Sequence, residues 1–318
     1  MNRKRFTGLA AGTLVLTLLV ILWGAFVRAS SSGAGCGREW PLCKGGILPN
    51  SPTAATLVEL AHRTSSGLAL CMVAALVFFA RRQFPNGHRV RFAAAAALVF
   101  FVAEALIGAT LVLRELVAYN TSVARAVVLS LHLVNTFLLM GSLSLVVLFS
   151  AADFPKNPVT DRFKGVCTVG ILLLLVVGVS GALTSLGDTL FPARSFSEGM
   201  ALDFEQSSHF LLRLRIWHPV IAIGTACYLM LLSGYLALTR SNVRVKVYAR
   251  LLIGLLLTQV ILGMANLFTL GAIALQLAHL FVAHCVWMTN LMMTVSLKYY
   301  GERATVAEEL KGVSEGLF

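Results

Sequence analysis

Residues 165–187 read GVCTVGILLLLVVGVSGALTSLG, a run without a single charged side chain. A helix of about 20 apolar residues spans the hydrocarbon core of a bilayer, so this segment is predicted to cross a membrane. Outward from it in both directions, similar runs occupy roughly 7–27, 56–80, 92–113, 123–150, 209–238, 248–269 and 272–297. Eight such spans leave no stretch long enough for a separate domain outside the membrane.

The composition excludes a soluble enzyme. Hydrophobic residues make up 58% of the chain and charged residues 13%, against roughly 45–50% and about 25% in soluble domains. The net charge of +12 does not indicate nucleic-acid binding, because the basic residues lie in short segments between apolar spans. We therefore predict an all-α integral membrane protein with eight transmembrane helices.

The distribution of basic residues predicts the orientation in the membrane. Lys and Arg concentrate on the cytoplasmic side of membrane proteins. The first span has a basic start, but it exceeds the 7–15-residue core of a signal peptide, so we interpret it as a membrane helix. With both termini cytoplasmic, 17 of the 26 basic residues lie inside: Arg3, Lys4, Arg5, Arg81, Arg82, Arg89, Arg91, Lys156, Arg162, Lys164, Arg240, Arg244, Lys246, Arg250, Lys298, Arg303 and Lys311.

The six cysteines fall into two groups. Cys71, Cys167, Cys227 and Cys285 lie inside spans, where a thiol usually serves as a small apolar group. Cys36 and Cys43 share the first external loop, GCGREWPLC at 35–43, on the side where disulfides persist. This loop predicts a disulfide that staples the loop. A redox-active dithiol is the alternative, and a metal site would need more ligands.

The two halves of the chain repeat one another in parallel. Gly24-Ala25 ends the first span as Gly181-Ala182 ends the fifth, at an offset of 157 residues. The remaining matches pair His62 with His218, Gly108 with Gly263, and His132 with His279. The chain is thus predicted to form two tandem, pseudo-symmetric four-helix bundles in the same orientation, at 1–153 and 154–300, with a cytoplasmic tail at 301–318.

Four histidines stand at matching positions of the repeat. His62, His132, His218 and His279 lie one each on the even-numbered spans, at one depth in the outer half of the membrane. A lone membrane histidine more often serves in a hydrogen bond or a proton path. Two imidazoles on facing helices, however, form the axial pair that haem iron accepts. The pattern therefore predicts two haem sites, with His62 and His132 in one half and His218 and His279 in the other.

Three further histidines are second choices as ligands. His88 lies in a predicted cytoplasmic loop, where it is a solvated residue. His209 lies at the external mouth of the sixth span, and its first-half counterpart, near Pro52 or Thr53, cannot bind iron. His284 is five residues from His279, about 140° around the helix, and only His279 matches His132.

The repeat breaks its symmetry next to the first histidine of each pair. Glu59 precedes His62 by three residues, whereas Arg215 precedes His218 by three. Residues three apart share a helix face, which makes Glu59 the candidate catalytic carboxylate. Its alternative role is an ion pair with Arg63 four residues on. Six arginines near the outer side are candidates for pairing with haem propionates, or for interfacial snorkelling: Arg28, Arg63, Arg114, Arg125, Arg213 and Arg215, with Arg63 and Arg215 preferred.

A second break sets Glu104 of the third span against Gln259 of the seventh. A carboxylate inside a membrane marks a functional site by default. A buried hydrogen bond between helices is the other interpretation.

The chain resembles a known family in several stretches: Gly24-Ala-Phe-Val-Arg28, the loop 35–43, Glu59-Leu-Ala-His-Arg63, and the later histidines. It is similar to the bacterial haem A synthases along essentially all eight spans. The resemblance implies oxidation of the C8 methyl of haem O to a formyl by two successive hydroxylations. It also implies that His62 and His132 hold the substrate haem, and that His218 and His279 hold haem B. Residues 188–209 lack the second cysteine pair that some relatives carry there.

The resemblance further implies a place in the bacterial plasma membrane and the supply of haem A to terminal oxidases. Haem O synthase, terminal oxidase assembly and a homo-oligomer are candidate partners, and the sequence does not identify the electron donor. The main alternative is a dihaem b-type electron carrier, which usually places its haems at different depths. A transporter is weaker, because paired-repeat transporters bind substrate at interrupted helices near the midplane.

Overall fold

The computed structural model describes residues 2–46, 49–155 and 164–300. Its helices follow one another in the order α1 (Arg3–Ala29), α2 (Ala54–Gln83), α3 (Arg89–Leu113), α4 (Val123–Ala151), α5 (Lys164–Leu190), α6 (Phe196–Phe204), α7 (Phe210–Arg215), α8 (Trp217–Thr239), α9 (Val243–Phe268) and α10 (Ile273–Tyr300). The predicted tail at 301–318 lies outside the described residues, as do Lys156 and Arg162.

Eight helical segments are long and apolar enough to cross a membrane, which confirms the all-α membrane fold. They extend beyond several predicted ends, so that α1 begins at Arg3 and α10 reaches Tyr300. The predicted sixth span is confirmed at Phe210–Thr239, and it is divided into α7 and α8 at Ile216. Pro219 has no amide hydrogen, so the carbonyl of Arg215 lacks its helical donor at this point.

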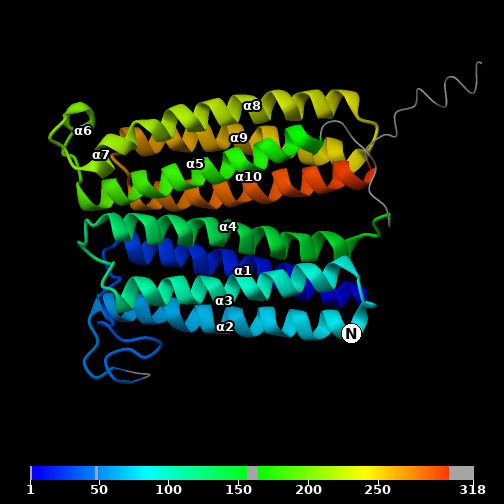
Figure 1. Ribbon diagram of the computed structural model, residues 1–318, viewed down its shortest axis with the longest axis horizontal. Helices are drawn as coiled ribbons and strands as arrows, with labels where there is room; N and C mark the ends of the chain where they lie inside the picture. Colours follow the sequence, from blue (N-terminus) through cyan, green and yellow to red (C-terminus); the bar gives the residue numbers. More distant parts are fainter. Residues whose placement is uncertain (1, 47–48, 156–163, 301–318) are drawn as a thin grey trace, which may run out of the picture.

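The helices pack as two four-helix bundles laid side by side (Figure 1). In the N-terminal bundle, α1 contacts α2 and α4, and α3 joins α2 to α4. In the C-terminal bundle, α5 contacts α8 and α10, and α9 joins α8 to α10. Each bundle has a hydrophobic core of its own, around Leu76 and Leu143 in the first and Leu229 and Leu252 in the second.

The most extensive contacts between the bundles are made by four helices. The two central helices, α4 and α10, pack against each other, while α1 contacts α10 and α4 contacts α5. Because α1 matches α5 and α4 matches α10 in the repeat, the last two contacts are equivalent. The bundles are therefore related by a pseudo-twofold axis that passes between α4 and α10.

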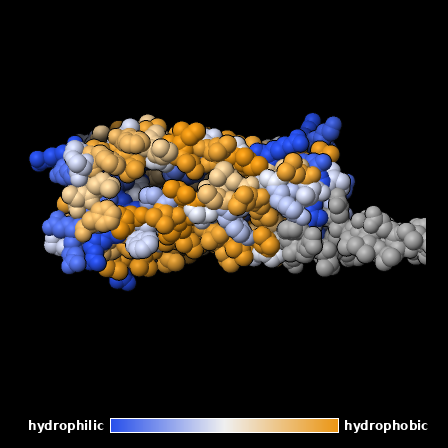
Figure 2. All heavy atoms as spheres, turned by 90° about the horizontal axis from the view of Figure 1, so that it is seen from above, coloured by the Kyte–Doolittle hydropathy of each residue, from blue (hydrophilic) through white to orange (hydrophobic). Residues whose placement is uncertain are grey.

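The two ends of the molecule differ. At one end, here called the loop end, lie α6 and the described parts of the segment between α1 and α2, residues 30–46 and 49–53. The start of α1 and the α2–α3 turn lie at the other, the N-terminal end (Figure 1). Between them, apolar residues cover most of the face in Figure 2, with hydrophilic residues gathered toward the ends. Phe92 and Leu238 remain 80% and 87% exposed. Such a surface suits lipid rather than water.

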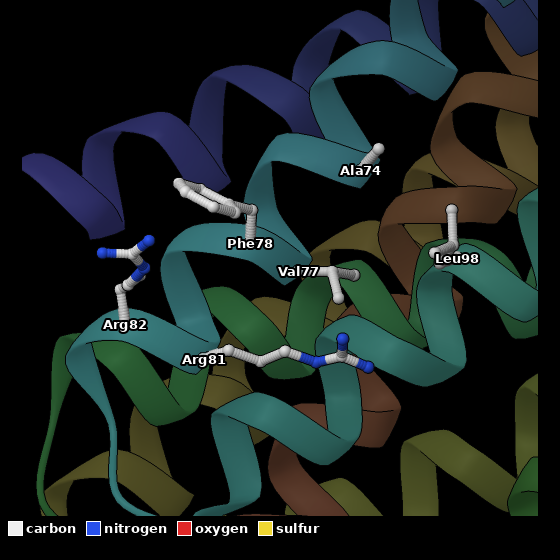
Figure 3. Close-up of a pocket in the computed structure, with 6 residues that line it drawn as sticks. All are labelled: Ala74, Val77, Phe78, Arg81, Arg82 and Leu98. Carbon is white, nitrogen blue, oxygen red and sulfur yellow. The ribbon is translucent and has the colours of Figure 1, made fainter.

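A hollow of about 390 Å³ opens on α2 near the N-terminal end (Figure 3). The guanidinium of Arg82 lies 5.1 Å from the centre of the Phe78 ring at its edge. Phe78 is 16 residues, or about 24 Å along a helix, from His62. The hollow contains none of the predicted site residues; its lining is Ala74, Val77, Phe78, Arg81, Arg82 and Leu98.

Candidate functional site

The four repeat-related histidines all lie near the loop end. Counted from that end, His62 is on the third turn of α2, His132 on the third turn of α4 and His279 on the second turn of α10. His218 is at the start of α8, but the preceding α7 places it at a similar depth. At 1.5 Å per residue, the four side chains lie about 9–14 Å inside the membrane-spanning segments.

Each of these histidines lies against a glycine of the preceding transmembrane helix. A methyl group added at Gly24 of α1 would lie 2.7 Å from Cε1 of His62, and one at Gly181 of α5 would lie 3.0 Å from Cε1 of His218. Gly263 of α9 and Gly108 of α3 face His279 and His132 in the same way, at 3.3 and 3.9 Å. The four glycines therefore leave room for the imidazole rings beside the helix backbone.

The rings in the C-terminal bundle are spaced to bind one metal between them. Centres of the His218 and His279 rings are 6.4 Å apart, with nearly perpendicular planes. Two imidazoles on one metal would have their centres about 6 Å apart, since each metal–nitrogen bond is about 2 Å. Nδ1 of His218 is 3.0 Å from Oγ of Ser180, which itself donates to the carbonyl of Val177. The histidine is thus the donor, and its Nε2 is left for a metal.

The side chains fit a haem better than a bare metal ion. Within the described residues, no cluster of three His, Cys, Asp or Glu side chains that could hold an ion occurs, whereas haem iron needs only axial ligands from the protein. Nδ1 of His62, of His132 and of His279 are buried without a hydrogen-bond partner in the part of the chain that the structure describes. Two pairs of imidazoles, one in each bundle, could hold two haems.

Glu104 and Gln259 lie next to the second histidine of each pair. Glu104 of α3 places Oε1 3.2 Å from Nδ1 of His132, and it also accepts hydrogen bonds from Asn135 and Thr136. In the C-terminal bundle, the amide nitrogen of Gln259 lies 3.1 Å from Nε2 of His279. The symmetry break seen in the sequence therefore lies at a histidine in each bundle.

Glu59 holds the loop between α1 and α2. Its carboxylate is 3% exposed, accepts from the amide of Cys36 at 2.8 Å and pairs with Arg63 at 2.5 Å. Arg63 also donates to the carbonyls of Glu39 and Leu42. A disulfide joins Cys36 to Cys43, with the sulfurs 2.04 Å apart. The loop, the disulfide and the Glu59–Arg63 pair thus form one structure above the N-terminal bundle.

Arg215 performs the equivalent task in the other bundle. Its guanidinium binds Asp188 at the end of α5 and Asp203 in α6, at 2.8 and 2.5 Å, and lies 3.3 Å from the carbonyl oxygen of Gly199. Glu59 and Arg215, at matching positions and of opposite charge, therefore each anchor the loop-end segment of their own bundle. The acids that pair with Arg215 are far away in the sequence, and no local pattern indicated them.

Comparison with known proteins decides the family. Residues 7–291 match the family model described as cytochrome oxidase assembly protein, COX15-CtaA. The chain belongs to the haem A synthase family.

Relatives in this family cover most of the chain. It is 28% identical to a haem A synthase of Geobacillus thermodenitrificans, over 94% of this chain and 93% of the relative. For a haem A synthase of Alkalihalophilus pseudofirmus the identity is 25%, over 92% and 97%. A Thermus thermophilus protein named protoheme IX farnesyltransferase is 38% identical over 98% of this chain. The chain spans only 52% of that relative's length.

Two other arginines at the loop end of this family member have partners within the protein. Arg28 donates to Ser185 and Thr189 of α5 and to Gln276 of α10. Arg125 is 4% exposed and donates to the carbonyls of Ala118 and Asn120. The guanidiniums of Arg28, Arg125, Arg63 and Arg215 are thus all engaged by protein groups, and their role toward propionates stays a prediction.

The remaining histidines differ in environment. His88 and His209 accept hydrogen bonds from backbone amides at the starts of α3 and α7. His284 is fully buried on α10, with its ring centre 4.9 Å from that of Phe137 on α4. Neither ring nitrogen of His284 has a hydrogen-bond partner among the described residues. Its place between the bundles was not indicated by the repeat.

Proposed function

We propose that this chain is a haem A synthase, which oxidises the C8 methyl of haem O to a formyl group. Its family membership supports the activity, and the four histidines that lie against glycines in two equivalent bundles support two haem sites. We assign the substrate haem to His62 and His132, and the cofactor haem B to His218 and His279. This assignment rests on the different neighbours of the two pairs, with Glu59 and Glu104 near the first and Arg215 and Gln259 near the second.

Methyl to formyl is a four-electron oxidation. Two C–H bonds are replaced in turn by C–OH bonds, and the resulting geminal diol loses water. Each oxygen atom comes either from dioxygen, with two electrons and two protons from a donor, or from water, with two electrons passed to an acceptor. When bound, the haem B supplies one-electron transfer. The histidines of each bundle hold the haems, and the apolar helices exclude bulk water.

Glu59 is the proposed catalytic carboxylate. It is buried in a low-dielectric site three residues before His62, where a fixed negative charge stabilises positive charge developing on the porphyrin edge. A general base in the second hydroxylation or in loss of water is the alternative chemical role. Its contacts with Arg63 and Cys36 hold the carboxylate in place.

The proposed setting is the bacterial plasma membrane, with both termini in the cytoplasm and the loop end outside. We also propose that the chain works beside a haem O synthase. The name and double length of the Thermus thermophilus relative support this, since one polypeptide there combines a region like this chain with further sequence. Direct transfer of haem O suits a product that is too apolar to cross water.

The test is the haem content of the purified chain. Expressed with a supply of haem O, the full-length protein should contain haem B together with haems O and A, separated by the pyridine haemochrome spectrum and chromatography. Growth under ¹⁸O-labelled dioxygen or in labelled water identifies which one supplies the formyl oxygen. Haem B alone, at two sites per chain, would instead establish the dihaem electron carrier.

A further inference from the structure

Glu104 is a membrane carboxylate whose hydrogen bonds determine how it meets His132. The amide nitrogen of Asn135 donates to the carbonyl of Phe100 at 2.8 Å and to Oε2 of Glu104 at 2.6 Å. The hydroxyl of Thr136 contacts Oε1. An ionised carboxylate only accepts hydrogen bonds, and Oε1 is the atom 3.2 Å from Nδ1 of His132. Glu104 is therefore held with Oε1 in close charge contact with Nδ1.

This arrangement leaves Nε2 of His132 available to iron. A neutral imidazole carries its proton on one nitrogen, and the partner of that nitrogen selects the tautomer. A carboxylate oxygen 3.2 Å from Nδ1 electrostatically favours the proton on Nδ1, which leaves the lone pair on Nε2. A carboxylate in this position also makes the ligating nitrogen more basic.

The C-terminal bundle has a neutral amide beside the corresponding histidine, and this amide meets the other ring nitrogen. Gln259 approaches Nε2 of His279 with its amide nitrogen, and Nδ1 of that ring has no partner among the described residues. The carbonyl oxygen of Gln259 is buried and also lacks a partner there. A neutral amide gives the ring no negative charge, so the two bundles present differently tuned histidines.

We propose that Glu104 is a positioning residue that makes His132 a more strongly donating ligand than His279, so that the haem on His62 and His132 is the more electron-rich of the two. The inference rests on the proposed function, because it takes these histidines to be haem ligands. A more basic axial ligand stabilises ferric over ferrous iron, which lowers the reduction potential of that haem. The Glu104/Gln259 difference thereby separates the two potentials within a nearly symmetric protein.

The experiment measures both reduction potentials in the full-length chain, loaded with haem O and haem B and titrated without dioxygen. Glu104→Gln should raise the potential of the haem on His62 and His132, shift its low-spin ferric EPR signal, and weaken its binding by about 10- to 100-fold. Its potential in Glu104→Asp, which keeps an acceptor, should stay closer to that of the wild type. The haem on His218 and His279 should be unchanged in both, which also shows that the variants fold.

The reciprocal variant is Gln259→Glu, which should lower the potential of the other haem alone. Unchanged potentials in both Glu104→Gln and Gln259→Glu would overturn the inference and leave Glu104 as a hydrogen bond between α3 and α4. If His132→Ala retains a normal first-bundle haem, the proposed haem assignment itself fails, and this outcome is distinct from the previous one.

Discussion

Arg28 of α1 donates hydrogen bonds to the side chain and the carbonyl of Ser185 of α5, the residue at its own matching position in the second half of the chain. The offset of 157 residues is the same as that between Gly24 and Gly181. Two residues at matching positions of the repeat are thus hydrogen-bonded to each other. Their contact joins the two bundles near the loop end.

Loss of the Arg28 guanidinium should loosen this junction. Arg28→Ala leaves Ser185, Thr189 and Gln276 without their charged donor, and we expect a loss of about 1.5–3 kcal/mol in unfolding free energy. Thermal denaturation in detergent, followed by the haem absorbance, measures it. Arg5→Ala is the matched control, because Arg5 is exposed and such surface changes stay within about 0.5 kcal/mol. Equal stability of the two variants would contradict the prediction.

Substitutions in the two histidine pairs should have different effects on the haem content. His218→Ala or His279→Ala should remove the low-spin haem B signal, because the remaining imidazole cannot occupy both axial positions. His62→Ala and His132→Ala should abolish haem A formation and leave haem B in place, since each bundle has its own core. Equal loss of haem B in all four variants would show that the two-site assignment is wrong.

The glycines beside the histidines offer a sharper test. Ala in place of Gly in a helix usually stabilises it by up to about 1 kcal/mol, yet Gly24→Ala would bring a methyl to 2.7 Å from the His62 ring. We expect Gly24→Ala to impair haem A formation and Gly181→Ala to reduce haem B. At Gly12 of α1, an added methyl has no atom within 4 Å. Gly12→Ala should therefore leave both haems unchanged. The haem spectra of the three variants test whether the glycines beside the histidines are required for haem binding.

Glu59→Gln should keep both haems and lose most conversion of haem O, by about 10²- to 10³-fold. The amide keeps the size of the side chain and an acceptor for the Cys36 amide, but it removes the charge. Haem extraction and chromatography measure the yield and any hydroxylated intermediate. Normal haem A yield would restrict Glu59 to its pairing with Arg63 and its hold on the loop.

The disulfide predicts a specific pattern of thiol labelling. In isolated membranes, Cys36 and Cys43 should react with a membrane-impermeant alkylating reagent only after reduction. The double variant Cys36→Ser/Cys43→Ser should still make haem A if the bridge only staples the loop. Loss of activity with both haems retained would instead favour the redox role, and labelling without reductant would show that the bridge does not form.

Apolar length and the repeat were sufficient to predict the spans, because both are local properties of the chain. The same patterns could not indicate α6, which is only nine residues long, or the partners of Arg215. Asp188 and Asp203 reach Arg215 only through the fold. The three-residue spacing from His62 made Glu59 the candidate carboxylate, and the four-residue spacing to Arg63 gave the alternative of an ion pair, which the structure contains. Its bond to the amide of Cys36 depends on a loop conformation that no spacing determines.

The equivalent α1–α10 and α4–α5 contacts are those of an isologous dimer, in which the same patch of each subunit meets the other. The two halves of this polypeptide therefore contact each other as two copies in a homodimer would. In a true homodimer, any change at position 59 or 104 would occur twice and alter both centres together. In one polypeptide each position instead occurs as two independent residues, and the pairs Glu59 with Arg215 and Glu104 with Gln259 give the two halves different side chains beside their histidines.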